Sequence, residues 1–308
     1  MRLFRLVLDP RAPQATAWQA DTIWGHLCWA LRYLHGETAL CDFIVRHREG
    51  DPPIVLSDGF PGDLLPRPLL PDVTQDTSGL PLDEQRARFG DAKRGKGRLF
   101  LSPADFERVL RGEPVVGEGP PSPITTGAVL KNRIDRITGT TGSKGELFSF
   151  DEQRWPTITV YTRISQDFIG LAGTLFSYLA GTGYGKRKSV GYGSLALRSF
   201  APYDTLPAAE NPNAFVSLSS FIPSATDPVH GYWRTRVKYG KLGEEFAVSS
   251  NPFKRPLVQL IAGSVFFDDP VRPWYGRMVP GLSPSHPEAV QYGLALALPV
   301  RVGGGLSA

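Results

Sequence analysis

The sequence has little of what a disulfide-bonded or metal-binding protein requires. Only two cysteines, Cys28 and Cys41, occur in 308 residues, and neither belongs to a Cys-x-x-Cys motif or a Cys/His cluster. This spacing argues against a zinc site and against a disulfide framework. Both cysteines lie in stretches of helical pattern, so we expect both to be reduced core residues, and we expect neither a metal nor a cofactor.

Long apolar runs and clustered acids are also missing. No run approaches the roughly 18 apolar residues that a bilayer-spanning helix needs, and no signal peptide precedes Asp9. These absences predict a cytoplasmic protein without membrane contact. Metal-dependent phosphodiester cleavage would require clustered carboxylates, but the one adjacent aspartate pair, Asp268-Asp269, stands before Pro270 and is typical of a turn.

Glycine and proline, by contrast, are abundant. The 33 glycines and 28 prolines favour many turns and strands over long helices. A chain of 308 residues exceeds the usual size of one core, so we predict two domains, 1–204 and 205–308. The net charge is only +4, so a nucleic-acid surface would have to be a local patch.

One stretch, 181–195, concentrates glycines, two tyrosines and three consecutive cations. It runs Gly-Thr-Gly-Tyr-Gly-Lys-Arg-Lys-Ser-Val-Gly-Tyr-Gly-Ser-Leu. It is no phosphate-binding P-loop, because Lys186 is followed by Arg187 instead of Ser or Thr. It is no dinucleotide fingerprint either, because a strand follows it where a helix would be needed.

Such a backbone can lie flat against RNA, with tyrosines stacking on unpaired bases and cations neutralising phosphates. A solvated surface loop is the alternative. The predicted RNA contacts of this glycine-rich loop are Gly183, Tyr184, Gly185, Lys186, Arg187, Lys188, Ser189, Gly191 and Tyr192.

The periodicity of the first domain predicts a strand, a helix from Asp21 or Thr22 to Gly36, a short helix ending at Gly50, and a strand. Further on, a strand at 157–163 and a helix capped by Ser165 lead to the glycine-rich loop and a last strand. This order is that of a ferredoxin-like βαββαβ unit with insertions. The insertion at 60–116 is irregular apart from a helix at 103–111 that Ser102 is expected to cap. Its basic run 86–98 is either an RNA contact or a solvated face.

Residues 124–150 predict an extended hairpin with a Gly/Thr/Ser tip. Its alternation would present Lys131, Arg133 and Arg136 outward. The hairpin either reaches across a nucleic-acid duplex or is an ordinary surface hairpin. The second domain is strand-rich, with strands expected at 214–218, 233–239, 257–267 and 290–300.

Several segments in chain order resemble the repeat-associated mysterious proteins (RAMPs) of CRISPR effector complexes, and among these the subunit that caps the 5′ end of the guide RNA in type III-A complexes. The matching segments are 21–31, 56–61, 64–71, 132–136, the glycine-rich loop, 238–243 and 256–266.

The resemblance implies an α+β fold of two ferredoxin-like (RRM-like) domains with insertions and a thumb-like β-hairpin in the first. It implies a non-catalytic subunit in antiviral defence that binds the repeat-derived 5′ tag of the guide and the guide–target duplex. Its protein partners would be the Cas10-type large subunit and a backbone RAMP subunit. RNA contacts are then expected, beyond the glycine-rich loop, at His26, Lys131, Asn132, Arg133, Arg136 and Lys254.

His26 leaves a second hypothesis open. Some RAMPs are metal-independent endoribonucleases that process the guide precursor with a histidine, which would serve as general base beside a 2′-hydroxyl. A direct RNA contact and a structural role are the alternatives for His26, and none of the other histidines presents itself as a second catalytic acid. A third possibility is a scaffold that touches only protein partners.

Overall fold

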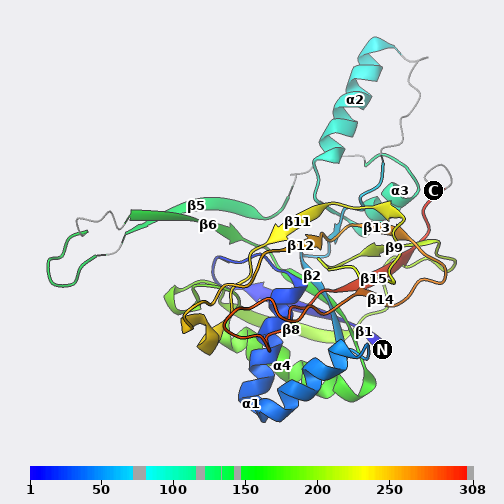
Figure 1. The fold of residues 1–308 in the computed structure, drawn as a ribbon. Coiled ribbons are helices and arrows are strands. Elements are labelled where there is room, and N and C mark those ends of the chain that lie inside the picture. The colour runs from blue at the N-terminus through cyan, green and yellow to red at the C-terminus, as the bar shows by residue number, and fades with distance from the viewer. Residues whose placement is uncertain (72–80, 116–121, 133, 142–146, 304–308) are drawn as a thin grey trace.

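The computed structural model describes residues 1–71, 81–115, 122–132, 134–141 and 147–303 (Figure 1). Its first sheet is antiparallel throughout and has the strand order β2-β7-β1-β8. Two helices connect these strands, so that the chain order is strand, helix, strand, strand, helix, strand. This is the order predicted for the first ferredoxin-like unit. Its elements are β1 (Arg2–Pro10), α1 (Ala20–Arg48), β2 (Ile54–Pro61), β7 (Ile158–Ile164), α4 (Ile169–Thr182) and β8 (Leu195–Pro202).

Helix α1 consists of two helical segments joined at Gly36, whose φ of 85° interrupts the helix as the sequence predicted. Its buried side chains, among them Trp24, Leu27 and Leu31, follow the three- and four-residue spacing. The predicted cap at Asp21 or Thr22 is wrong, because the helix begins earlier, at Ala20. Asp21 lies instead in the first turn, where a carboxylate interacts favourably with the helix dipole.

The second sheet has the strand order β10-β13-β9-β15-β14, beside a separate two-stranded ribbon of β11 and β12. The strand expected at 257–267 is divided in two by a turn at Gly263, which has a φ of 93°. Residues 205–303 contain no α-helix, only a short 3-10 turn, so the second ferredoxin-like domain stays a prediction. The elements are β9 (Ala214–Ser217), β10 (Gly231–Tyr232), β11 (Thr235–Lys238), η3 (Glu244–Val248), β12 (Leu257–Leu260), β13 (Val265–Phe267), β14 (Trp274–Gly276) and β15 (Leu294–Val300).

The two sheets share one apolar core. A single cluster of buried side chains includes Leu6 and Phe176 from the first region and Val216 and Leu298 from the second. The edge strand β2 is covered by the second region, because Asp58 N–H donates to the Leu218 carbonyl at 2.8 Å. The boundary near residue 204 stays a prediction.

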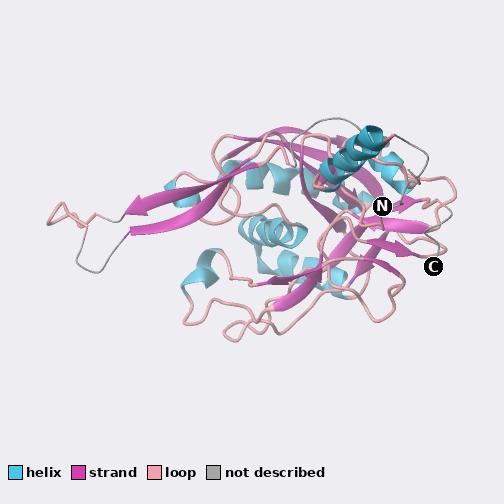
Figure 2. Cartoon of the chain, turned by 90° about the horizontal axis from the view of Figure 1, so that it is seen from above, coloured by secondary structure: helices cyan, strands magenta, loops and turns pink. Residues whose placement is uncertain are grey.

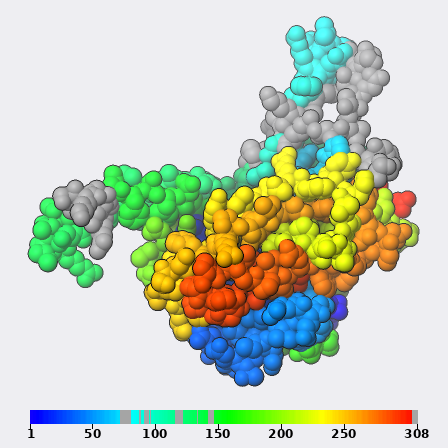
Figure 3. All heavy atoms as spheres, viewed as in Figure 1, coloured from blue at the N-terminus to red at the C-terminus, as the bar shows by residue number. Residues whose placement is uncertain are grey.

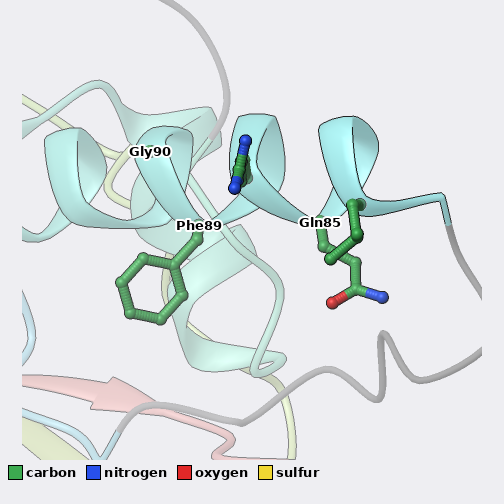
Figure 4. A pocket seen from close by; sticks show the side chains of 5 residues that line it. Gln85, Phe89 and Gly90 are labelled. Carbon is green, nitrogen blue, oxygen red and sulfur yellow. The ribbon is translucent and has the colours of Figure 1, made fainter.

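Two segments project from this body in Figure 1, and one of them, the hairpin, also projects in Figure 2. One is the predicted hairpin, formed by β5 (Thr125–Asn132) and β6 (Leu147–Arg154). The other is α2 (Leu82–Lys96), which the sequence did not predict because few apolar residues mark a buried face. Three residues of one α2 face, Leu82, Gln85 and Phe89, line a shallow hollow with Arg86 and Gly90 (Figure 4).

The insertion between β2 and the hairpin also contains the predicted helix, α3 (Pro103–Leu110). Ser102 caps it, since its hydroxyl accepts a hydrogen bond from Asp105 N–H at 3.1 Å. Two short strands, β3 (Leu65–Pro66) and β4 (Phe100–Leu101), pair beside it. The basic run 86–98 lies mostly on α2, where Arg86 is exposed; the side chains of Arg88, Lys93, Arg94 and Lys96 lie outside the described part.

Two expectations from composition meet different outcomes. Cys28 is buried as predicted, whereas Cys41 is exposed, so its assignment to the core was wrong. Within the described ranges, no helix has the length and hydropathy that crossing a membrane requires.

Candidate nucleic-acid interface

The glycine-rich loop is pinned at its two ends. Helix α4 ends at Gly183, which has a φ of 83°, and Tyr184 N–H then donates to the Gly193 carbonyl at 2.9 Å. Gly193 in turn donates its N–H to Pro13 at 2.9 Å. A Cβ atom at Gly193 would collide with the Tyr184 carbonyl, so only glycine allows the two chain segments to approach this closely.

Tyr184 is a core residue, with only 1% of its surface exposed. Its ring stacks on Trp18 with centroids 3.8 Å apart, and its hydroxyl donates to the Ala17 carbonyl at 2.7 Å. Burial raises the pKa of this phenol far above its ordinary value. The predicted stacking of Tyr184 on an unpaired base is therefore contradicted, because the ring is enclosed by the protein.

Tyr192 is also turned inward, with 7% of its surface exposed. Its hydroxyl donates to Glu152 Oε2 at 3.1 Å, and its ring packs edge-on against Phe150, with centroids 5.3 Å apart. Both partners belong to β6. Tyr192 therefore joins the loop to the base of the hairpin, and the base stacking predicted for it is contradicted as well.

His26 holds the middle of the loop. Its Nε2 accepts a hydrogen bond from Gly185 N–H at 2.9 Å, and its ring lies 5.1 Å from that of Tyr184. Burial, with the nearby Lys188 ammonium, lowers the pKa of His26 to about 4. The neutral ring already uses Nε2 as an acceptor, so this geometry favours the structural role over that of a general base.

The three loop cations have different environments. Lys186 is exposed, and no carboxylate in the described part of the chain pairs with it. Arg187 places its guanidinium 4.1 Å from the ring centroid of Phe150 and 5.2 Å from that of Phe148, and Lys188 Nζ is paired with Glu244 at 2.6 Å. Lys186 is thus the cation most available to a phosphate, with the exposed Ser189 and Gly191 further along the loop.

The hairpin's polar side chains that were predicted to contact RNA are exposed wherever the structure describes them. Lys131, Asn132 and Arg136 are exposed, while Arg133 lies outside the described residues. Lys131 Nζ lies 5.8 Å from the ring centroid of Tyr192, near the loop. Apolar side chains are exposed beside these cations, namely Leu130, Ile134, Ile137, Leu147 and Phe148.

Lys254 lies apart from this surface. It is half-buried, and its ammonium donates to Gln291 Oε1 at 3.0 Å. Burial lowers its pKa, and the neighbouring Lys238 adds to this effect. The geometry therefore does not favour the RNA contact that was predicted for Lys254.

The loop's supports are the residues that the sequence did not reveal. Thr16 Oγ1 accepts a hydrogen bond from Lys186 N–H at 3.0 Å, and Trp18 stacks on Tyr184. Glu152 and Glu244 each bind a loop side chain. Nothing local marks these residues, because they lie far from the loop in sequence. The described residues contain no cluster of His, Cys, Asp and Glu that could hold a metal ion.

Fold and site together define an α+β protein in which a pinned glycine-rich loop adjoins a projecting hairpin. The model of the RAMP superfamily matches residues 19–196, more than half of the chain, and the chain belongs to this superfamily.

Among individual proteins, the chain is similar to the "CRISPR system Cms protein Csm4" of Thermococcus onnurineus (strain NA1). The two are 27% identical over 311 residues, which cover 97% of each chain.

Solved structures share the fold. A chain in the crystal structure of a Csm1-Csm4 cassette in complex with pppApA matches with a TM-score of 0.66 and 21% identity, over 99% of this chain and 100% of that one. A chain of the Csm3-Csm4 subcomplex of a type III-A CRISPR-Cas interference complex matches with a TM-score of 0.62 and 13% identity, over 97% and 99% of the two chains.

Proposed function

We propose that this chain is a non-catalytic RNA-binding subunit of a type III-A CRISPR ribonucleoprotein. It holds the repeat-derived 5′ tag of the guide RNA and bridges a Cas10-type large subunit to the backbone RAMP subunits. Membership of the RAMP superfamily and the similarity to Csm4 over 97% of both chains support this assignment.

The observation that carries the proposal is the glycine-rich loop itself, which is fixed from inside and open outside. Its tyrosines and His26 anchor it to the body, while Lys186, Ser189 and Gly191 remain exposed. The loop leaves the C-terminus of α4, where the helix dipole repels phosphate, so the attraction must come from side chains and loop amides. A fixed loop contacts RNA without a large loss of conformational entropy.

The hairpin supplies the second half of the proposal. It projects from the body beside the loop (Figure 1) and combines exposed cations with exposed apolar side chains. Cations attract the phosphates of a guide–target duplex, and apolar side chains pack against bases at its end. The tag held at the loop would thus continue into a duplex that meets the hairpin.

Substitution of Lys186, the exposed cation of the glycine-rich loop, tests the proposal directly. Replacing Lys186 with Gln should weaken binding of an RNA that carries the repeat-derived tag, and should flatten the slope of log affinity against log salt by about 0.7, the value for one phosphate of a single strand. Arg48→Gln is the matched control, because Arg48 is an exposed cation on a different element. Fluorescence anisotropy over a salt series measures both effects, and an unchanged slope in the Lys186 variant would contradict the assignment.

The endoribonuclease hypothesis has its own experiment. We expect the purified chain to leave unprocessed repeat RNA intact in the presence of EDTA. Metal-independent cleavage that is lost in His26→Ala would overturn the non-catalytic assignment.

A further inference from the structure

The ribbon of β11 and β12 presents its charged face to the protein. Lys238 Nζ is 2.6 Å from Asp21 Oδ1 and also donates to Gln19 Oε1 at 2.8 Å. Gln259, on the paired strand, donates to Asp21 Oδ2 at 3.2 Å. Burial alone would raise the pKa of Asp21, but the Lys238 charge and these hydrogen bonds lower it. The polar side chains on the inward face of the ribbon are therefore hydrogen-bonded to residues at the start of α1.

The outward face consequently carries the apolar side chains. Successive side chains of a strand point to opposite faces, so Val237 and Tyr239 lie on the face opposite to that of Arg236 and Lys238. Val237 pairs with Val258, and both are exposed. Toward the loop end of the ribbon, Tyr239 is 78% exposed and Phe253 is 61% exposed. Figure 3 shows the yellow and gold atoms of this region at the surface of the body.

The charges at this end of the ribbon are cationic. Lys241 and Arg255 are exposed, and no described carboxylate pairs with either. Lys241 Nζ lies 5.7 Å from the ring centroid of Phe253. The two nearest acids in sequence are already neutralised, since Glu244 binds Lys188 at 2.6 Å and Glu245 binds Arg32 at 3.0 Å.

The ion pair between Lys188 and Glu244 also joins the ribbon's loop to the glycine-rich loop. We infer that the end of the ribbon formed by Tyr239, Lys241, Phe253 and Arg255 is a second RNA-binding surface, on which unpaired nucleotides of the guide stack. The inference rests on the proposed function. Exposed aromatic rings beside unpaired cations are the combination that single-stranded RNA requires, because rings stack on any base and cations neutralise its phosphates.

The surface also compensates for the glycine-rich loop, whose two tyrosines are enclosed. Lys186 provides charge there but no open ring, whereas the ribbon provides rings and charge together. The exposed pair Val237 and Val258 lies farther from the loop end and is not part of the proposed site.

The test is a double variant, Tyr239→Ala with Phe253→Ala, in the full chain. The probe is a fluorescein-labelled single-stranded RNA that begins with the repeat-derived tag. We expect affinity to fall about fivefold or more, with an unchanged salt slope, because neutral rings release no counterions. Lys241→Gln should instead lower the slope by about 0.7. Val229→Ala is the control, since Val229 is 85% exposed in the loop before β10 and belongs to none of the proposed RNA contacts, and it should bind as the wild type does.

The possible failures are distinguishable. If the double variant binds like the wild type while Lys186→Gln weakens binding, the ribbon surface is overturned and the proposed function stands. If the wild type shows no preference for tagged over untagged RNA, the proposed function fails and the inference fails with it. Unchanged RNA affinity with loss of co-purifying protein subunits would make the ribbon a protein-docking surface and would equally overturn the inference.

Discussion

The glycine-rich loop and the hairpin are adjacent in space and both carry glycines and cations, but they are held in opposite ways. The loop is fixed along its length by His26, Thr16, Trp18 and Pro13. The hairpin is paired along its own strands and is tied to the body near its base, through Gln14 opposite Gln153 and through the contacts of Phe150 and Glu152 with the loop.

This difference shows that the type of a residue does not by itself determine what the residue does. A tyrosine or an arginine in the loop contributes to a fixed backbone, because its ring or guanidinium is used inside the protein. An apolar side chain on the hairpin contributes little to folding, as Ile137, 95% exposed, illustrates. The conformation of the loop is thus set by contacts within the chain, whereas the apolar side chains of the hairpin would be buried only by a partner, as the proposed function requires.

Of the substitutions that test this difference between loop and hairpin, Tyr184→Ala should have the largest effect. Tyr184→Ala should lower the free energy of unfolding by about 3 to 5 kcal/mol, because it removes a buried aromatic ring and leaves Trp18 without its stacking partner. Urea unfolding followed by tryptophan fluorescence measures the change. Tyr184→Phe keeps the ring but loses two hydrogen bonds of the hydroxyl, the one donated to the Ala17 carbonyl and the one accepted from Gln19 N–H, and should cost about 1 to 3 kcal/mol.

An open hairpin residue is the matched contrast to Tyr184. Ile137→Ala should change the free energy of unfolding by less than about 0.5 kcal/mol. Equal losses in Tyr184→Ala and Ile137→Ala would contradict the distinction between a fixed loop and an open hairpin.

A second test uses pH at His26. Its pKa is about 4 in the folded protein and 6.5 as the ordinary value. Between these values the unfolded chain binds more protons, so the contribution of His26 is complete above pH 6.5 and is lost as the pH falls toward 4. His26→Gln keeps an acceptor for Gly185 N–H but does not titrate. Between pH 7 and pH 5, the free energy of unfolding of His26→Gln should therefore fall by about 1 to 2 kcal/mol less than that of the wild type.

Chemical denaturation at pH 7, 6 and 5 compares the two proteins. His47, whose pKa burial also lowers to about 4, remains in both and cancels in the difference. Parallel pH profiles of the wild type and His26→Gln would show that His26 titrates normally, and would remove the argument that its Nε2 is engaged.

The sequence predicts those features whose cause is local. The break of α1 at Gly36, the Ser102 cap and the two arms of the hairpin follow from backbone preference and side-chain period. Helix α2 was missed because the prediction of helices depended on the side-chain period, and a helix that projects from the body has no periodic buried face to detect.

The orientation of the site's side chains has distant causes and was not predictable. Tyr184 turns inward because of Ala17, which is 167 positions away. Lys238 turns inward because of Asp21, 217 positions away. A pattern of glycines, tyrosines and cations is the same whether the rings face solvent or core, so the sequence located the glycine-rich loop but not which of its residues are accessible.

The smallest expected effect concerns Arg187, where the two regions meet. Arg187 is a non-glycine residue in the left-handed region, with φ 66° and ψ 25°, a conformation that costs about 1 kcal/mol. Its guanidinium over Phe150 offsets that cost by a comparable amount. Arg187→Gly should therefore leave the free energy of unfolding within about 1 kcal/mol of the wild type, since it loses the ring contact but relieves the backbone, whereas Arg187→Ala should be less stable than Arg187→Gly.

Both Arg187 variants should nevertheless loosen the hairpin from the loop. Hydrogen–deuterium exchange should become faster in β5 and β6 near Phe148 and Phe150 and remain unchanged in β1 and β7, because only the hairpin's base loses a contact. Arg187→Lys keeps the charge but not the planar group that stacks on rings, so its exchange should lie between the wild type and Arg187→Ala. If exchange in β5 and β6 is the same in all four proteins, the guanidinium does not join the two regions, and the hairpin is held by the Tyr192–Glu152 hydrogen bond and the bridge between Gln14 and Gln153.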